Sequence, residues 1–167
     1  MIRHIIRGIV LTAIPVFVFG QIGLTPRGWT AAVFFLLVGA AAFYDIDTKQ
    51  IPDGLTAAVA AAGAFAFCLF PETAWWDRLL GTVCVSVLML AVTLCREDAF
   101  GGGDIKLAAA CGLFLGAARS LMAFGLATAA GSIYGLVRIA AGRANRRMRI
   151  ALGPFLGVGV FVAFWYF

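Results

Sequence analysis

Residues 105–140 read IKLAAACGLFLGAARSLMAFGLATAAGSIYGLVRIA and carry only three charged side chains, those of Lys106, Arg119 and Arg138. As one helix, this stretch would measure about 54 Å at 1.5 Å per residue, whereas the hydrocarbon core of a bilayer is about 30 Å thick. The stretch must therefore fold back on itself, and the pair Arg119 and Ser120 marks the expected turn. The stretch is therefore predicted to form two apolar helices.

The composition of the whole chain also indicates a protein that lies in a membrane. Of 167 residues, 63% are hydrophobic and 13% are charged, with a mean hydropathy of +1.00, whereas a soluble domain is about half apolar and about a quarter charged. These values exclude a soluble enzyme and a water-facing binding module. We predict an all-α polytopic membrane protein that forms a single transmembrane domain. Apolar runs separated by charges, Gly and Pro predict about seven spans, at residues 5–24, 29–44, 55–71, 79–95, 105–118, 120–140 and 151–167.

The lysines and arginines indicate how these spans are oriented. With seven spans, ten basic residues fall on the side of the N-terminus and three, Arg27, Arg78 and Arg119, fall on the other side. If residues 105–118 were instead a re-entrant segment, six basic residues would fall on the side of the N-terminus and seven on the other side. Because cytoplasmic loops carry the excess of Lys and Arg, we expect a cytoplasmic N-terminus and an external C-terminus. Orientation in a lipid bilayer then explains the net charge of +5 without nucleic acid.

The acidic residues are unevenly distributed along the chain. Six of the eight lie in two predicted loops on the N-terminal side: Asp45, Asp47 and Asp53 in YDIDTKQIPDGLT, and Glu97, Asp98 and Asp104 in REDAFGGGDIKL. For any one of them, a solvated loop charge is the alternative interpretation. The clustering is nevertheless independent of the basic residues, because acids contribute little to membrane orientation.

Two of these acids have unusual positions. Asp45 ends a short predicted span, which places an ionisable group at the edge of the hydrocarbon region, where such groups are costly and are functional candidates by default. Asp104 opens an apolar helix directly after Gly101, Gly102 and Gly103. An acid there can cap backbone N–H groups, but three glycines exceed what a cap requires and leave space for another chain to approach.

A pair of carboxylates supports one well-understood reaction, aspartyl peptide hydrolysis. Two neighbouring acids share a proton, so one activates a water while the other polarises the substrate carbonyl, without metal or cofactor. Other chemistries lack their motifs: the glycine run is neither a P-loop nor a dinucleotide fingerprint. Four cysteines without a CxxC pair and a single histidine, His4, predict no metal site and no Cys-His or Ser-His-Asp set.

Three segments resemble the type IV prepilin peptidases, membrane aspartyl proteases of the GxGD type. YDIDTKQIPDGLT is similar to the first motif of that family, with Asp45 followed seven positions later by Pro52 and then Asp53. GGGDIKLAAACGLFLG is similar to the second motif, and ALGPFLGVG resembles the last helix of the family. The resemblance implies that Asp45 and Asp104 are the catalytic acids, with Gly101, Gly102, Gly103, Lys106, Pro52 and Asp53 as supporting motif residues.

The same resemblance implies a substrate and a location. Members of the family cleave the basic leader of type IV prepilin-like precursors at the cytoplasmic face of the prokaryotic inner membrane. This chain is expected to lack the N-terminal cytoplasmic domain and the paired CxxC motifs of the long members, which also N-methylate the new N-terminus. It resembles the short members that serve tight-adherence or Flp-type pili, and we expect cleavage without methylation.

Several assignments are decided by helical geometry or remain open. Asp45 and Asp47 would point about 200° apart on a helix, so only one of them can face Asp104, and the resemblance selects Asp45. Asp47, Asp53, Glu97 and Asp98 are interpreted as solvated or leader-attracting charges. Lys106 either favours the ionised form of Asp104 or binds lipid phosphate. A small ion or solute transporter with cation-binding aspartates and a structural membrane subunit are the alternative functions.

Overall fold

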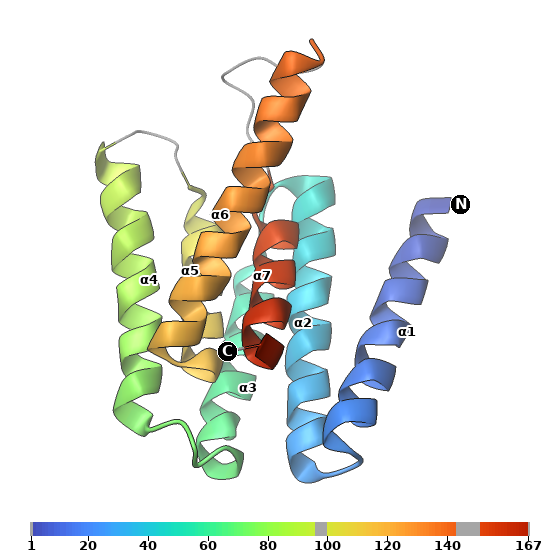
Figure 1. Cartoon of the computed structure of the whole chain (residues 1–167), viewed down its shortest axis with the longest axis vertical. Helices are drawn as coiled ribbons and strands as arrows, with labels where there is room; N and C mark the ends of the chain where they lie inside the picture. The colour runs from blue at the N-terminus through green and yellow to red at the C-terminus, as the bar shows by residue number, and fades with distance from the viewer. Residues whose placement is uncertain (1, 96–99, 143–150, 167) are drawn as a thin grey trace.

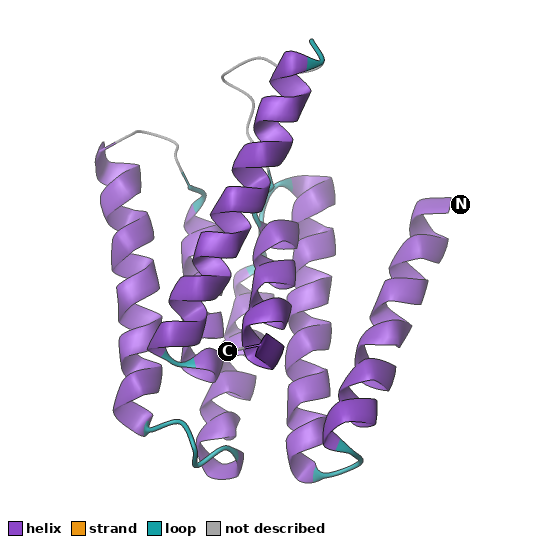
Figure 2. Cartoon of the chain, in the orientation of Figure 1, coloured by secondary structure: helices purple, strands orange, loops and turns teal. Residues whose placement is uncertain are grey.

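Apolar, glycine-punctuated runs fold into helices throughout the described part of the chain. The computed structural model describes residues 2–95, 100–142 and 151–166, and these contain helices joined by short turns, with no strand among them (Figure 2). The helices are α1 Ile2–Ile22, α2 Pro26–Thr48, α3 Asp53–Leu69, α4 Trp75–Cys95, α5 Gly102–Leu115, α6 Ala117–Ala140 and α7 Gly153–Tyr166. The prediction of an all-α membrane protein is confirmed.

The helices run up and down in one bundle, so their ends gather at two levels (Figure 1). The upper end in Figure 1 is where α1 begins, α2 ends, and α3, α5 and α7 begin. The lower end is where α2 and α4 begin and α3 ends. This places the segments 44–56 and 100–107 at the same end of the bundle, as their predicted position on one side of the membrane requires.

Four helices, α1, α2, α4 and α6, are long and apolar enough to cross a bilayer, and α3 and α7 are shorter apolar helices. The remaining helix, α5, is only 14 residues long, about 21 Å at 1.5 Å per residue. It packs against α3, α4, α6 and α7. In Figure 1 the turn between α5 and α6 lies above the lower ends of α2, α3 and α4. The short central helix therefore ends inside the bundle.

The turn between these two helices is not where the sequence predicted it. The expected turn at Arg119 and Ser120 is wrong by three residues, because α5 ends at Leu115 and Gly116 makes the turn. Gly116 has a φ of +82°, a backbone conformation that glycine adopts without the steric cost of a Cβ. A Cβ on Gly116 would also overlap the carboxylate of Asp77 on α4, which accepts a hydrogen bond from the backbone N–H of Ala117.

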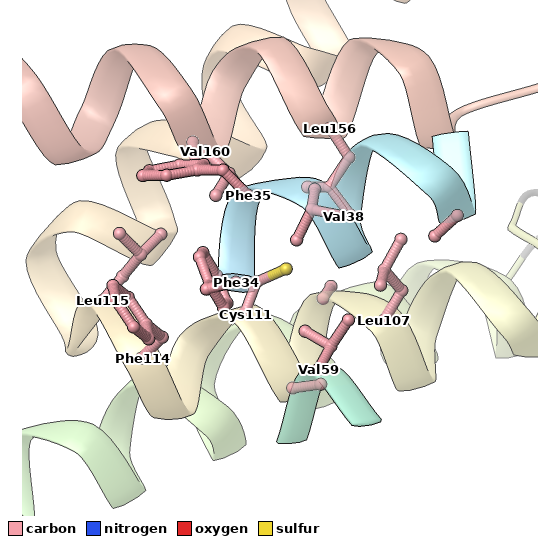
Figure 3. Packing of buried hydrophobic residues seen from close by; sticks show 14 of the residues in the cluster. Phe34, Phe35, Val38, Val59, Leu107, Cys111, Phe114, Leu115, Leu156 and Val160 are labelled. Carbon is pink, nitrogen blue, oxygen red and sulfur yellow. The ribbon is translucent and has the colours of Figure 1, made fainter. Parts of the chain in front are cut away.

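Figure 3 shows the part of the core where α2, α3, α5 and α7 meet. Phe34 of α2 stacks on Phe114 of α5 with ring centroids 3.9 Å apart. Val38 and Leu156 pack in the same cluster from α2 and α7. An aromatic pair of this kind contributes about 0.5–1.5 kcal/mol beyond its buried area. The cluster therefore holds together the helices that carry the two candidate acids.

Candidate active site

Asp45 lies in the last turn of α2, where its side chain is only 4% exposed. The helix ends at Lys49, which adopts a left-handed conformation with φ 54° and donates its backbone N–H to the carbonyl of Asp45. The chain then turns to Pro52, which is the N-cap of α3 and accepts the N–H groups of Leu55 and Thr56. Pro52 therefore lies where the next helix starts, seven residues after Asp45.

Asp104 is the third residue of α5, whose N-cap is Gly101. Its carboxylate accepts a hydrogen bond from the backbone of Gly101, while Oδ1 is buried and has no hydrogen-bond partner among the described residues. A Cβ on Gly103 would lie 3.2 Å from the Cβ of Ile51, which precedes α3, whereas a Cβ on Gly102 would meet nothing within 4 Å. Of these two glycines, only Gly103 makes room for another segment, and that segment belongs to this chain.

The two acids come from different helices and act on each other electrostatically. Asp45 is at the end of α2 and Asp104 is at the start of α5, and their carboxyl groups are close enough to repel when both are charged. Like charges that share a buried site favour a state in which only one of them is ionised. That Asp45 and Asp104 share a proton as catalytic acids stays a prediction.

Asp47 faces a different helix. Its two carboxylate oxygens accept hydrogen bonds of 2.6 and 2.7 Å from the guanidinium of Arg7 on α1. The opposite directions of Asp45 and Asp47 follow from their spacing of two residues on a helix. The structure therefore leaves Asp45 as the acid of the first motif that faces Asp104.

Lys106 has a partner other than the two that the sequence suggested. Its Nζ lies 2.7 Å from Oδ1 of Asp53 at the start of α3, and both side chains are largely exposed. Lys106 is two residues from Asp104 on α5, so the two side chains leave the helix in nearly opposite directions. Glu97 and Asp98 lie outside the described residues, as does the arginine cluster from 143 to 149.

A groove of about 420 Å³ lies on the same side of α5 as Lys106. Apart from Asp53 and Lys106 it is lined by small or apolar side chains and two threonines: Thr56, Ala57, Ala60, Thr82, Ala109, Ala110 and Leu113. Neither Asp45 nor Asp104 contributes to it. The groove is therefore not the site of the predicted chemistry.

One residue of the site was not predicted. The backbone N–H of Gly153, the first residue of α7, donates a buried hydrogen bond of 2.8 Å to Oδ2 of Asp45. The sequence singled out the segment, because ALGPFLGVG resembles the last helix of the family and the pair Gly153 and Pro154 suits the first turn of a helix. Nothing in that pair shows which side chain the helix start contacts.

No cluster of potential metal ligands occurs in the described ranges. There, no group of three or more His, Cys, Asp or Glu side chains could hold a metal ion. The four cysteines are free thiols, and only Cys111 is buried.

The sequence model of the type IV leader peptidase family matches residues 32–136, well over half of the chain. The chain belongs to this family. It is similar to proteins named prepilin leader peptidase/N-methyltransferase: it is 27% identical over 146 residues to that of Bacillus subtilis (strain 168), covering 87% of this chain and 59% of the relative. It is 28% identical over 143 residues to that of Stutzerimonas stutzeri, covering 81% of this chain and 50% of the relative. The protein of Aeromonas salmonicida (strain A449) is 27% identical over 147 residues, covering 84% and 50%.

This chain therefore spans about half of the length of these relatives. No solved structure gives a significant match. The resemblance inferred from the motifs is confirmed, and membership in a peptidase family argues against the transporter and structural-subunit alternatives. Asp45 and Asp104 both lie within the matched region, whereas Gly153 lies beyond it.

Proposed function

We propose that this bundle is the catalytic unit of a membrane aspartyl endopeptidase in which Asp45 and Asp104 are the catalytic acids. The observation that carries the proposal is the juxtaposition of two carboxyl groups from α2 and α5, sequence-distant helices, in a chain of the type IV leader peptidase family. Both acids belong to motifs with family-like spacing. The supporting residues Gly101, Gly103 and Pro52 shape the backbone around them.

The proposed reaction uses one ionised and one protonated carboxyl group. The carboxylate takes a proton from a water as the water oxygen attacks the scissile carbonyl carbon, and the protonated acid hydrogen-bonds to the carbonyl oxygen. Collapse of the tetrahedral intermediate breaks the C–N bond, and the proton taken from water passes to the leaving amine. This chemistry requires neither a metal ion nor an organic cofactor.

The proposed substrate is a type IV prepilin-like precursor with a short basic leader. The names of the relatives support this class of substrate. Asp53 lies at the upper end of the bundle with its side chain largely exposed, where it would attract a basic leader before cleavage. Cleavage is expected after the glycine that precedes the hydrophobic segment of the precursor.

The proposed location is the inner membrane of a prokaryote, with the two acids facing the cytoplasm. The ten-to-three division of basic residues supports this orientation. Reporter fusions test it: fusions at Thr73, in the lower turn between α3 and α4, and at Phe167 should both report the outside. A cytoplasmic signal at Phe167 would contradict the orientation.

Co-expression with a candidate prepilin tests the function directly. We expect a shift of the precursor to higher gel mobility, and Edman sequencing or mass spectrometry should place the new N-terminus after the leader glycine. A prepilin whose leader glycine is replaced by a bulky residue is the matched control and should stay uncleaved. An intact precursor with every prepilin tested, beside a folded and membrane-inserted enzyme, would contradict the proposal.

A further inference from the structure

The start of α7 contacts Asp45 through its backbone. The N–H of Gly153 lies 2.8 Å from Oδ2 of Asp45, in a buried hydrogen bond between residues 108 positions apart in sequence. The first N–H groups of a helix have no partner within the helix and carry partial positive charge. A carboxylate is the side chain that best satisfies them, so this contact favours the ionised form of Asp45.

The contact requires glycine at position 153. A Cβ there would lie 2.8 Å from Oδ2 and 3.0 Å from the Cβ of Asp45, closer than nonbonded atoms pack. Gly157, one turn further along α7, is different: its Cβ would lie 3.6 Å from Val38 and 3.7 Å from Ala42, which is ordinary van der Waals contact. The two glycines face the same helix, but only Gly153 has no space for a methyl group.

Asp104 has a different set of partners. One oxygen of its carboxyl group accepts the backbone N–H of Gly101, the N-cap of α5, and Oδ1 is buried without a hydrogen-bond partner among the described residues. Buried polar atoms nearly always have a partner. A carboxyl oxygen that lacks one is best accommodated when it carries a proton and is aimed at an incoming acceptor.

We propose that Gly153 is a positioning residue, which fixes Asp45 as the ionised general base and leaves the shared proton on Oδ1 of Asp104. This inference rests on the proposed function. In the first step Asp45 takes the proton of the attacking water, and the O–H of Asp104 donates a hydrogen bond to the substrate carbonyl oxygen. Gly153 acts through Asp45 and touches neither the water nor the substrate.

The charged groups around Asp45 are compatible with this assignment. Among the described residues, Lys49 on the same helix acts on Asp45, and Asp45 acts on Asp104 of α5. From α1, Arg7 engages Asp47 instead. From α3 and α5, Asp53 and Lys106 pair with each other. The Gly153 N–H is the only hydrogen-bond donor to the Asp45 carboxylate among the described residues.

Two alanine variants on one helix test the positioning role by kinetics. In Gly153→Ala the methyl group displaces the carboxylate, so kcat should fall about 100-fold, with KM for the prepilin unchanged. The acidic limb of the pH–activity profile should move up by roughly one pH unit, because the ionised base loses a hydrogen bond. Gly157→Ala is the matched control and should keep the wild-type kcat and pH profile. Equal profiles for the two variants would overturn the proposal.

An infrared titration tests the assignment without a substrate. The carboxyl band of the remaining acid is isolated in Asp104→Asn and in Asp45→Asn by subtracting the spectrum of the double variant. We expect Asp45, in the Asp104→Asn protein, to lose its proton at a lower pH than Asp104 does in the Asp45→Asn protein. Adding Gly153→Ala to Asp104→Asn should raise that pH, and adding Gly157→Ala should not.

The reverse order of the two titrations would overturn the inference, even if the enzyme cleaves prepilin. If the wild type cleaves no prepilin, the proposed function fails, and the titration still decides which acid is ionised. If Gly153→Ala does not fold, the comparison of the two aspartate variants decides the assignment alone.

Discussion

An ionisable side chain lies inside the bundle at each end of α5, Arg78 of α4 at the lower end and Asp104 at the upper end, and the two differ in their hydrogen bonds. At the lower end, Arg78 is 1% exposed, and its guanidinium donates hydrogen bonds to four carbonyls, those of Phe70, Thr73, Leu113 and Phe114. At the upper end, Asp104 keeps one buried oxygen without a partner among the described residues. One end of this short helix therefore meets a guanidinium with all its hydrogen bonds made, supplied by α4, and the other end carries a carboxyl oxygen with no partner among the described residues.

The physical reason for the lower arrangement is that α5 ends inside the bundle. The last carbonyls of a helix have no partner within it, and a membrane interior offers no water to replace one. Arg78 supplies N–H groups to these carbonyls and to those that end α3. A fully paired charge of this kind stabilises structure, whereas an unpaired oxygen beside a second acid is available for a substrate.

The largest expected effect, on prepilin cleavage, comes from replacing the two acids at the upper end of the bundle. Asp45→Asn and Asp104→Asn should each reduce prepilin cleavage by about 100-fold to 10,000-fold, because each removes one member of a pair that acts as a unit. Folding stability should change little, since Asn is nearly isosteric with Asp and carries no charge. Cleavage assays on purified protein, with thermal unfolding as the fold control, measure both. Normal cleavage by either variant would contradict the aspartyl mechanism for this pair.

Replacing Arg78 at the lower end should lower the free energy of unfolding and leave the proposed catalytic acids unchanged. Arg78→Met leaves the carbonyls of Phe70 and Phe114 without donors and should lower the free energy of unfolding by about 2–5 kcal/mol. The matched control is Arg27→Met, because Arg27 forms an exposed ion pair with Glu72, and such pairs contribute about 0–1 kcal/mol. Chemical denaturation in micelles compares them. Equal stabilities would show that the guanidinium does not hold the end of α5.

A smaller effect is expected where α5 crosses α4. A Cβ on Gly112 would overlap backbone atoms of Gly81, so Gly112→Ala should force the helices apart and lower the free energy of unfolding by about 1–3 kcal/mol. A Cβ on Gly125 in α6 would meet nothing within 4 Å, so Gly125→Ala should stabilise the protein by up to about 1 kcal/mol. Thermal unfolding of both variants checks the difference in sign. A destabilised Gly125→Ala would contradict the packing explanation.

Local periodicity explains what the sequence could predict. The apolar runs predict every helix with boundaries within a few residues, because a span needs a fixed length of apolar chain. The spacing of Asp45 and Asp47 predicts that they face apart, since that geometry is local to one helix. The same argument applies to Lys106 and Asp104, and it would have predicted that Lys106 is not the partner of Asp104.

Contacts between distant segments explain the rest. The turn at Gly116 depends on Asp77 of α4, and the choice of Gly116 over Arg119 is visible only once the two helices are packed. The contact between Gly153 and Asp45 joins the last helix to the second. Neither contact has a sequence pattern, because the partners are fixed by how whole helices pack and not by spacing along the chain.

The smallest effects are expected at the exposed acids of the upper end, Asp47 and Asp53. These residues test whether an acid must face the proposed water, or whether any acid at this end of the bundle supports cleavage. Asp47→Asn breaks the pair with Arg7, and Asp53→Asn breaks the pair with Lys106. Exposed pairs contribute about 0–1 kcal/mol, and neither acid faces the proposed water, so each variant should keep a substantial fraction of cleavage. KM for a basic leader is the quantity to compare, since loss of an exposed acid weakens attraction without changing chemistry. If Asp47→Asn is inactive while Asp45→Asn cleaves normally, the first motif is displaced by two residues. If all four aspartate variants cleave normally, the upper end of α5 is not the active site.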